Sequence, residues 1–127
     1  MSAFLIVDDN EVLRETLASY LRSKLPNHTV LTAEDGAEAI EIMTDKPVSA
    51  VFTDLLMPNK DGYEVLSYVH NNFPSIPVVV MTSAWSSELG ALVWRLGKIN
   101  YLEKPFHPED VDALVKDLLF SIVDHAA

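Results

Sequence analysis

Five residues with charged or hydroxyl side chains stand at or just after the ends of short apolar runs: Asp8, Asp9, Asp54, Thr82 and Lys104. Three carboxylates brought to one place would repel each other, and a single lysine would neutralise only one of them. The two negative charges that remain are balanced by one divalent cation. Carboxylate oxygens without histidine or cysteine ligands favour Mg²⁺, for which Mn²⁺ or Ca²⁺ could substitute.

Such a site would support phosphoryl transfer. A carboxylate beside a bound cation can attack a phosphoryl group and form an aspartyl phosphate, as in some ATPases. We expect Asp54 to be the nucleophile, because it stands alone at the end of its run, while Asp8 and Asp9 would hold the cation. Thr82 and Lys104 would bind the phosphoryl oxygens, so the reaction would need positioning and charge neutralisation but no separate general base.

Each of these residues also has a simpler interpretation by itself. Asp9, or its neighbour Asn10, could cap the helix that follows. Asp54 could be a loop acid, Thr82 an ordinary strand residue and Lys104 a solvated side chain. Their combination at equivalent positions after successive apolar runs favours a functional site.

The pattern of apolar residues predicts five strands that alternate with five helices. The strands are expected at Ala3–Val7, Thr29–Ala33, 49–53, 76–82 and 99–102, and the helices within 12–21, 36–43, 62–71, 86–96 and 111–123. This alternation predicts an α/β fold with a parallel sheet between helices. Because the carboxyl ends of parallel strands share one edge, where ligands bind, such a fold would bring the five chemically active residues together.

The composition is that of one globular domain. The chain has 127 residues, of which 49% are hydrophobic and 22% charged, and this excludes disordered, collagenous and coiled-coil classes. A net charge of −10 argues against direct binding to nucleic acid or to an anionic membrane. The absence of cysteine excludes disulfides, thiol catalysis and thiolate metal sites. The first apolar run is too short for a signal peptide or a membrane span, so we expect a cytoplasmic protein.

Five segments of the sequence resemble the receiver domain of bacterial two-component response regulators, and the resemblance covers essentially the whole chain. The segments are LIVDDN at 5–10, AEDGAEAI at 33–40, VFTDLLMPNKDG at 51–62, VVVMTSA at 78–84 and LGKINYLEKPF at 96–106. The resemblance implies a single receiver domain over residues 1–127. It also implies a flavodoxin-like three-layer (βα)5 sandwich with strand order 2-1-3-4-5.

The resemblance further implies a role for each site residue. Asp54 would accept a phosphoryl group from a phosphohistidine of a sensor histidine kinase or a histidine phosphotransfer protein. Asp9 would bind Mg²⁺ directly, Asp8 mainly through water, and Leu56 through its backbone carbonyl. Lys104 would pair with the phosphate, and its peptide bond to Pro105 would be cis, an arrangement that proline tolerates.

A switch is implied as well. Thr82 would move toward the phosphoryl group and the ring of Tyr101 would turn inward behind it. The surface of the fourth helix, fifth strand and fifth helix would then change shape and control an effector domain, a protein partner or a second copy of the chain. The output would be binding, so the protein would not be an enzyme beyond its own phosphorylation and dephosphorylation.

Two apolar residues depart from the commoner family pattern: Leu56 and Ala84, two positions after Asp54 and Thr82. The family often has polar side chains there that influence the attack of water on the acyl phosphate. We therefore expect slow self-dephosphorylation.

Particular residues disfavour three alternative functions. A Mg²⁺-dependent phosphohydrolase with an aspartate nucleophile would use a second acid at position 56, where this chain has Leu56. A flavin carrier would need a loop rich in Gly, Ser and Thr after the first strand, where Asp8 and Asp9 would repel phosphate. A docking module that is never phosphorylated would not need the complete set of acids.

Overall fold

The computed structural model describes residues 3–55, 61–83, 86–96 and 99–126, in which strands alternate with helices as predicted. The strands are β1 (Ala3–Val7), β2 (Thr29–Ala33), β3 (Ala50–Asp54), β4 (Val78–Thr82) and β5 (Ile99–Glu103). The helices are α1 (Glu11–Lys24), α2 (Gly36–Asp45), α3 (Asp61–Asn72), α4 (Ser87–Leu96) and α5 (Pro108–Ala126).

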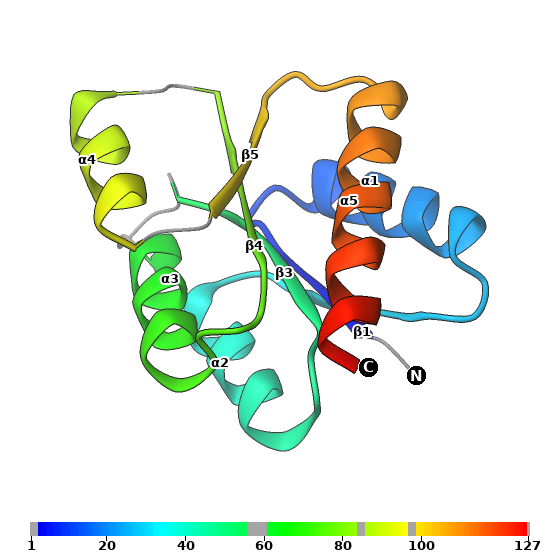
Figure 1. Ribbon diagram of the computed structural model, residues 1–127. Coiled ribbons are helices and arrows are strands. Elements are labelled where there is room, and N and C mark those ends of the chain that lie inside the picture. The colour runs from blue at the N-terminus through cyan, green and yellow to red at the C-terminus, as the bar shows by residue number, and fades with distance from the viewer. Residues whose placement is uncertain (1–2, 56–60, 84–85, 97–98, 127) are drawn as a thin grey trace.

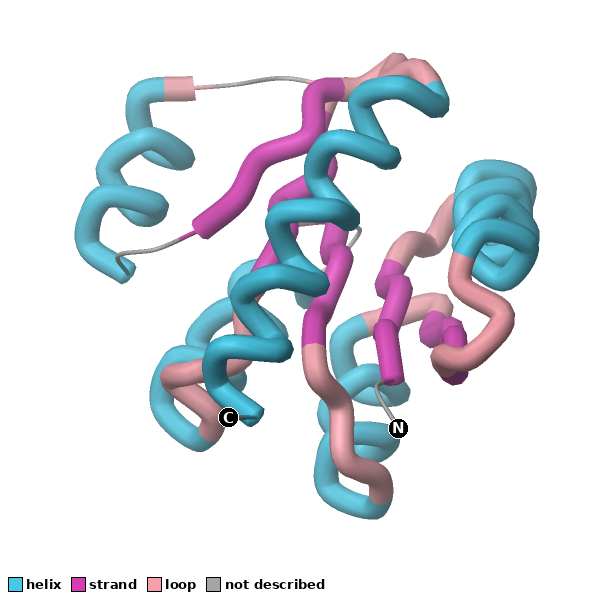
Figure 2. The backbone as a smooth tube through the Cα atoms, turned by 45° about the vertical axis from the view of Figure 1, so that its right-hand side comes forward, coloured by secondary structure: helices cyan, strands magenta, loops and turns pink. Residues whose placement is uncertain are grey.

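The strands form one parallel sheet between two layers of helices (Figure 1). The strand order is β2-β1-β3-β4-β5, which makes β3 central and β5 an edge strand. Helices α1 and α5 cover one face, and α2, α3 and α4 cover the other. Figure 2 shows α5 lying across the strands of its face. The expected flavodoxin-like sandwich with order 2-1-3-4-5 is confirmed.

Alternate residues of each central strand enter two separate hydrophobic cores. In β1, Phe4 and Ile6 pack with residues of α1 and α5, whereas Leu5 and Val7 pack with residues of α2 and α3. Every residue of β1, β3 and β4 is buried, because helices cover both of their faces. This double burial explains why their sequences are nearly continuous apolar runs.

The strand register aligns the carboxyl ends of the central strands. Val7 of β1 pairs with Thr53 of β3, so the residues that follow them, Asp8 and Asp54, lie at the same level. Asp54 in turn pairs with Met81 of β4, one residue before Thr82. Main-chain geometry therefore brings acids from two strands to one end of the sheet.

Several element boundaries differ from the predicted ones. Asp54 is the last residue of β3 and keeps its pairing with β4, so it belongs to the strand and not to the loop after it. Strand β4 begins at Val78, after Pro77, which has no N–H to donate to the sheet. Helix α3 begins at Asp61, one residue before the predicted start at Gly62.

Gly62 packs directly against the backbone of the phosphoacceptor candidate. A Cβ atom at this position would lie 2.1 Å from the carbonyl oxygen of Asp54 and 2.5 Å from the Cα of Leu55. Real Cβ atoms do not approach backbone so closely, and a backbone atom cannot rotate away as a flexible side chain can. Glycine at this position therefore allows the start of α3 to pack on the end of β3.

We predict that Gly62→Ala destabilises the protein by about 1–3 kcal/mol, because α3 must shift away from β3. Urea denaturation measures the change. Gly90→Ala in α4 is the matched control, and it should be neutral or stabilising by up to about 1 kcal/mol because alanine favours helix. A Gly62→Ala protein as stable as the wild type would contradict the packing described here.

Candidate functional site

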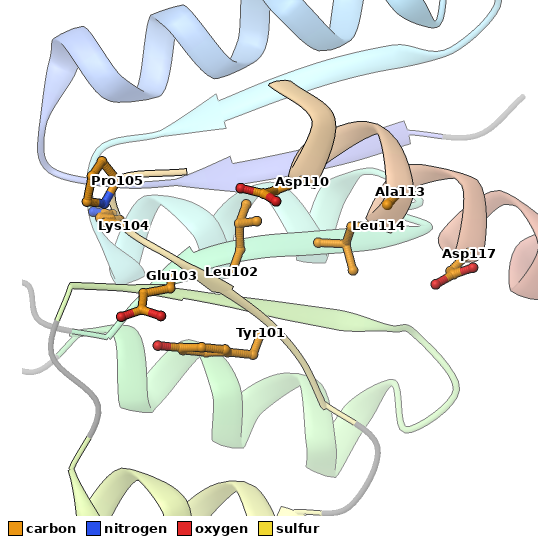
Figure 3. Close-up of a pocket in the computed structure, with 9 residues that line it drawn as sticks. All are labelled: Tyr101, Leu102, Glu103, Lys104, Pro105, Asp110, Ala113, Leu114 and Asp117. Atoms are coloured by element: carbon orange, nitrogen blue, oxygen red, sulfur yellow. The ribbon is translucent and has the colours of Figure 1, made fainter. Parts of the chain in front are cut away.

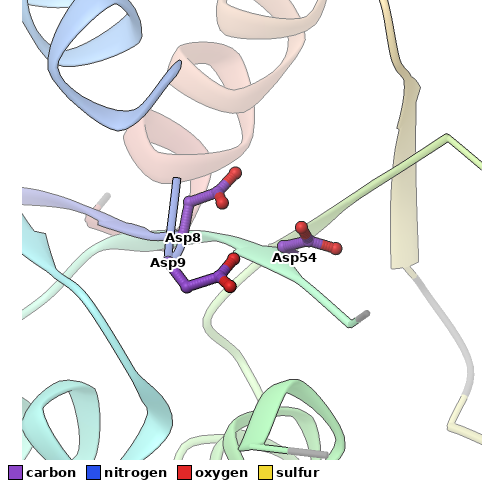
Figure 4. Close-up of side chains that lie close together, drawn as sticks. All are labelled: Asp8, Asp9 and Asp54. Carbon is purple, nitrogen blue, oxygen red and sulfur yellow. The ribbon is translucent and has the colours of Figure 1, made fainter. Parts of the chain in front are cut away.

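Three carboxylates meet at the carboxyl end of the sheet (Figure 4). Asp8 follows β1, Asp9 is its neighbour, and Asp54 ends β3. Each contributes a carboxylate oxygen, and these oxygens lie within 4.8 Å of one another. Asp8 is 0% and Asp54 6% exposed, whereas Asp9 is exposed to solvent. The cluster thus has two buried carboxylates and one that is accessible to solvent.

Hydrogen bonds from the start of α1 hold Asp8 in place. The backbone N–H of Asn10 donates to Asp8 Oδ1 at 2.9 Å, and Arg14 Nη1 donates to the backbone carbonyl of Asp8 at 2.9 Å. The side chain of Asn10 caps α1 by accepting from the N–H of Leu13 at 3.1 Å. Asn10 therefore takes the capping role that the sequence left open between Asp9 and Asn10.

Lys104 joins the cluster from the loop after β5. Its Nζ lies 2.9 Å from Asp8 Oδ2 and 2.8 Å from Asp54 Oδ2, and its side chain is 17% exposed. The backbone N–H of Lys104 donates to the carbonyl of Thr82 at 2.9 Å, which ties this loop to the end of β4. The peptide bond between Lys104 and Pro105 is cis, as the resemblance implied.

The other predicted residues occupy different surroundings. Thr82 is completely buried at the end of β4. Tyr101 lies on the edge strand β5 with 36% of its surface exposed. Trp94 of α4, to which the sequence analysis gave no role, is 88% exposed. Leu56 and Ala84 lie outside the described residues.

The donor set fits a hard divalent cation. Within the described part of the chain, Asp8, Asp9 and Asp54 are the group of acidic or histidine side chains close enough together to hold a metal ion. Their ligand atoms are all carboxylate oxygens, which suit Mg²⁺ better than Zn²⁺. Two of them already share one ammonium group, so the cluster as a whole is short of positive charge.

Two residues of the site were not predicted from the sequence. Arg14, one turn into α1, donates to the backbone carbonyl of Asp8, and the sequence pattern assigned it no role. Gly62 was placed only at the start of a predicted helix, although it packs on the backbone of Asp54. No local motif marks the Arg14 contact, whereas a glycine at the start of a helix is a general signal that backbone can approach closely there.

Known proteins share both the sequence pattern and the architecture. Residues 4–116 match the family described as the response regulator receiver domain. This chain is a response regulator receiver domain. As such, it belongs to the signalling modules of two-component systems.

The curated relatives of the receiver domain are response regulators. This chain is 34% identical over 102 residues to response regulator RR06 of Streptococcus pneumoniae, and the match covers 80% of this chain and 46% of that protein. It is 31% identical over 111 residues to the DNA-binding transcriptional regulator NtrC of Escherichia coli, covering 87% of this chain and 23% of NtrC. It spans 24% of the NtrX-like response regulator of Rickettsia felis, with 32% identity over 114 residues. The chain thus covers less than half the length of each of these relatives.

Solved structures of similar architecture include two response regulators. Chemotaxis protein CheY4 of Vibrio cholerae superposes with a TM-score of 0.83 at 26% identity, over 93% of this chain and 98% of that one. A two-component transcriptional regulator AraC from Clostridium phytofermentans superposes with a TM-score of 0.88 at 28% identity, over 100% and 99% of the two chains. No helix in the described part of the receiver domain is long and apolar enough to span a membrane.

The environment of the cluster shifts the pKa of two members. Burial raises the pKa of Asp8 above 3.8, because hydrogen bonds from Asn10 and Lys104 offset only part of the desolvation. Burial by itself would lower the pKa of Lys104, but hydrogen bonds and charge interactions with Asp54 and Asp8 outweigh it and raise the pKa above 10.5. Lys104 is therefore charged at neutral pH.

We predict that Asp8→Asn raises the melting temperature of the metal-free receiver domain at pH 7. The raised pKa means that ionised Asp8 costs stability in the folded state, and asparagine removes this charge. Protonation of the wild type restores the same stability as the pH falls through the raised folded pKa toward 3.8, so the difference between the two proteins should shrink there. Asp9→Asn, at the exposed acid, should change the melting temperature less. A lower melting temperature for Asp8→Asn at pH 7 would contradict this account of Asp8.

We predict that Lys104→Met binds divalent cations more tightly and is less stable without them. Removal of the ammonium group leaves two buried carboxylates uncompensated, at a cost of roughly 1–3 kcal/mol in metal-free buffer. The same loss of positive charge should strengthen Mg²⁺ binding by about tenfold, as measured by calorimetric titration. Lys104→Arg keeps the charge and serves as the control, with nearly wild-type affinity. Equal Mg²⁺ affinity for Lys104→Met and Lys104→Arg would show that Lys104 does not set the charge of the site.

Proposed function

We propose that Asp54 of this receiver domain accepts a phosphoryl group from a phosphohistidine of a sensor histidine kinase or histidine phosphotransfer protein. The observation that carries the proposal is the position of the Asp54 carboxylate. It ends the central strand, lies 2.8 Å from the ammonium group of Lys104, and has two further carboxylates beside it.

The transfer exchanges one phosphorus bond for another. A carboxylate oxygen of Asp54 forms a bond to phosphorus, the bond between phosphorus and the imidazole nitrogen breaks, and its electron pair stays on that nitrogen. Lys104 is already within hydrogen-bond distance of Asp54, so a short movement of Nζ can bring it to the phosphoryl oxygens. The hydroxyl of Thr82, at the end of the neighbouring strand, is the proposed second contact.

The cluster would hold Mg²⁺ during this reaction. The proposed ligands are Asp9 directly, Asp8 mainly through water, Asp54, and the backbone carbonyl of Leu56. The exposed position of Asp9 and the burial of Asp8 agree with this division. The bound cation would neutralise the charge that gathers on the phosphoryl oxygens. We expect that Mn²⁺ or Ca²⁺ can substitute, because the ligands are oxygens.

Phosphorylation would act as a conformational switch. It adds negative charge and strong hydrogen-bond acceptors at Asp54, which draws Thr82 and Lys104 toward the new group. Tyr101 lies on the strand next to Thr82, two positions earlier in the register, and would turn inward when Thr82 moves. A partner that prefers the altered surface of α4, β5 and α5 would then shift the population toward it.

The proposed output is binding and not turnover. Residues 1–127 would form one receiver domain that acts on an effector domain, a protein partner or a second copy, without direct contact to nucleic acid or membrane. Its covalent chemistry would be limited to its own phosphorylation and dephosphorylation in the cytoplasm. The net charge of −10 agrees with a protein partner.

Intact mass measurement after incubation with acetyl phosphate and Mg²⁺ tests the proposal. The wild type should gain the mass of one phosphoryl group, and Asp54→Ala should gain none. Asp45→Ala, which removes an exposed acid at the end of α2, is the matched control and should be phosphorylated like the wild type. Chelation of Mg²⁺ should prevent the gain. Equal phosphorylation of Asp54→Ala and wild type, or none in either, would overturn the assignment.

A further inference from the structure

The backbone of Asp8 is held from two sides at the edge of the acidic cluster. Its N–H donates to the carbonyl of Ala33 in β2 at 3.1 Å, and its carbonyl accepts from Arg14 Nη1 at 2.9 Å. Asp8 is completely buried, so its carbonyl oxygen has no access to solvent and needs a donor within the protein. Arg14 therefore supplies a hydrogen bond that water cannot replace.

The Arg14 contact also fixes the peptide unit that leads into Asp9. The carbonyl of Asp8 and the N–H of Asp9 belong to one planar peptide group, so a hydrogen bond to this carbonyl restricts rotation of the whole unit. Figure 4 shows the side chains of Asp8 and Asp9 leaving this short segment beside Asp54. The Asp9 side chain is exposed, so neighbouring side chains do little to orient it and the backbone conformation matters more.

Other contacts at this segment hold the side chain of Asp8. The N–H of Asn10 donates to Asp8 Oδ1 at 2.9 Å. Lys104, which stands just after β5 (Figure 3), donates to Asp8 Oδ2 at 2.9 Å. Neither bond involves the peptide unit between Asp8 and Asp9, so Arg14 has a role that these two bonds do not duplicate.

Acidic side chains lie beside the guanidinium group of Arg14. Its Nε is 3.5 Å from Glu15 Oε1, and its side chain borders a polar hollow of about 250 Å³ that Glu34 and Glu38 also line. Arg14 bonds to a carbonyl that is not a proposed metal ligand, whereas Lys104 bonds to the carboxylates themselves. We therefore expect Arg14 to act on the site through geometry more than through its charge.

We propose that Arg14 is a positioning residue of the Mg²⁺ site, which orients the peptide unit between Asp8 and Asp9 so that both carboxylates can serve the cation. The inference rests on the proposed function, because it adds a residue that acts through the proposed ligands. Contacts that orient metal ligands in this way change metal affinity by about tenfold or more when they are removed. The direction of the change is diagnostic: loss of a positive charge alone would strengthen cation binding, whereas loss of orientation weakens it.

Calorimetric titration with Mg²⁺ tests the proposal by comparing Arg14→Gln with the wild type. The matched control is Arg22→Gln, about two turns further along α1, because Arg22 Nη2 donates to the carbonyl of Val30 at 3.0 Å. Each variant removes one positive charge and one hydrogen bond from a guanidinium group to a backbone carbonyl. We expect Arg14→Gln to bind Mg²⁺ about tenfold more weakly, and Arg22→Gln to change the affinity by less than about twofold.

A second measurement tests the orientation without metal. In the metal-free protein, the backbone amide nitrogen resonance of Asp9 should shift in Arg14→Gln, because its peptide unit loses a hydrogen bond, and should stay in place in Arg22→Gln. Arg14→Lys keeps the charge on a shorter side chain and should bind Mg²⁺ with an affinity between those of the wild type and Arg14→Gln. If Arg14→Gln does not fold, weaker Mg²⁺ binding by Arg14→Lys than by the wild type supports the proposal, and equal or tighter binding overturns it.

The outcomes separate the role of Arg14 from the phosphoacceptor assignment. Unchanged or tighter Mg²⁺ binding by Arg14→Gln, or an unshifted Asp9 resonance, would overturn the proposal. Equal weakening by Arg14→Gln and Arg22→Gln would assign the effect to the packing of α1 in general and overturn it as well. Selective weakening by Arg14→Gln in a protein that acetyl phosphate does not phosphorylate would support the role of Arg14 and contradict the proposed function.

Discussion

The ammonium group of Lys104 lies between the carboxylates of Asp8 and Asp54, at 2.9 and 2.8 Å. Both carboxylates are buried, and each would be costly to ionise there without a partner. One lysine cannot satisfy two buried acids and the exposed acid Asp9 as well. The site is therefore built with a deficit of positive charge. A divalent cation would fill this deficit, and would then neutralise the charge of an incoming phosphoryl group. The parallel register, the cap of α1 and the tie between Lys104 and β4 all serve to hold this arrangement.

The sequence was sufficient to predict the parallel sheet and the positions of the acidic residues at one of its edges. Continuous apolar runs predicted the buried strands, and a parallel sheet puts the ends of its strands at one edge, so the approach of Asp8 to Asp54 followed from topology. The contacts of Arg14 and Gly62 could not be predicted in this way. They depend on how α1 and α3 sit against the strand ends, which hydrophobic spacing does not determine.

Lys104 links the acidic cluster directly to the ends of strands β4 and β5. Lys104 contributes its side chain to the cluster, and its backbone N–H donates to the end of β4. In the proposed function, a change of charge at Asp54 would act on β4 and β5 through this one residue. Thr82, buried at the end of β4, would be a second residue through which the change at Asp54 acts. Such direct contacts suit the proposed role, in which phosphorylation changes what the domain binds.

The most direct test of this account is anomalous diffraction from crystals of the receiver domain soaked in Mn²⁺. The account predicts a strong peak within coordination distance of the carboxylates of Asp8, Asp9 or Asp54, with Lys104 displaced from at least one of its two partners. A peak elsewhere on the acidic surface, with Lys104 still between Asp8 and Asp54, would contradict the claim that the uncompensated negative charge of this cluster binds the cation needed for phosphoryl transfer.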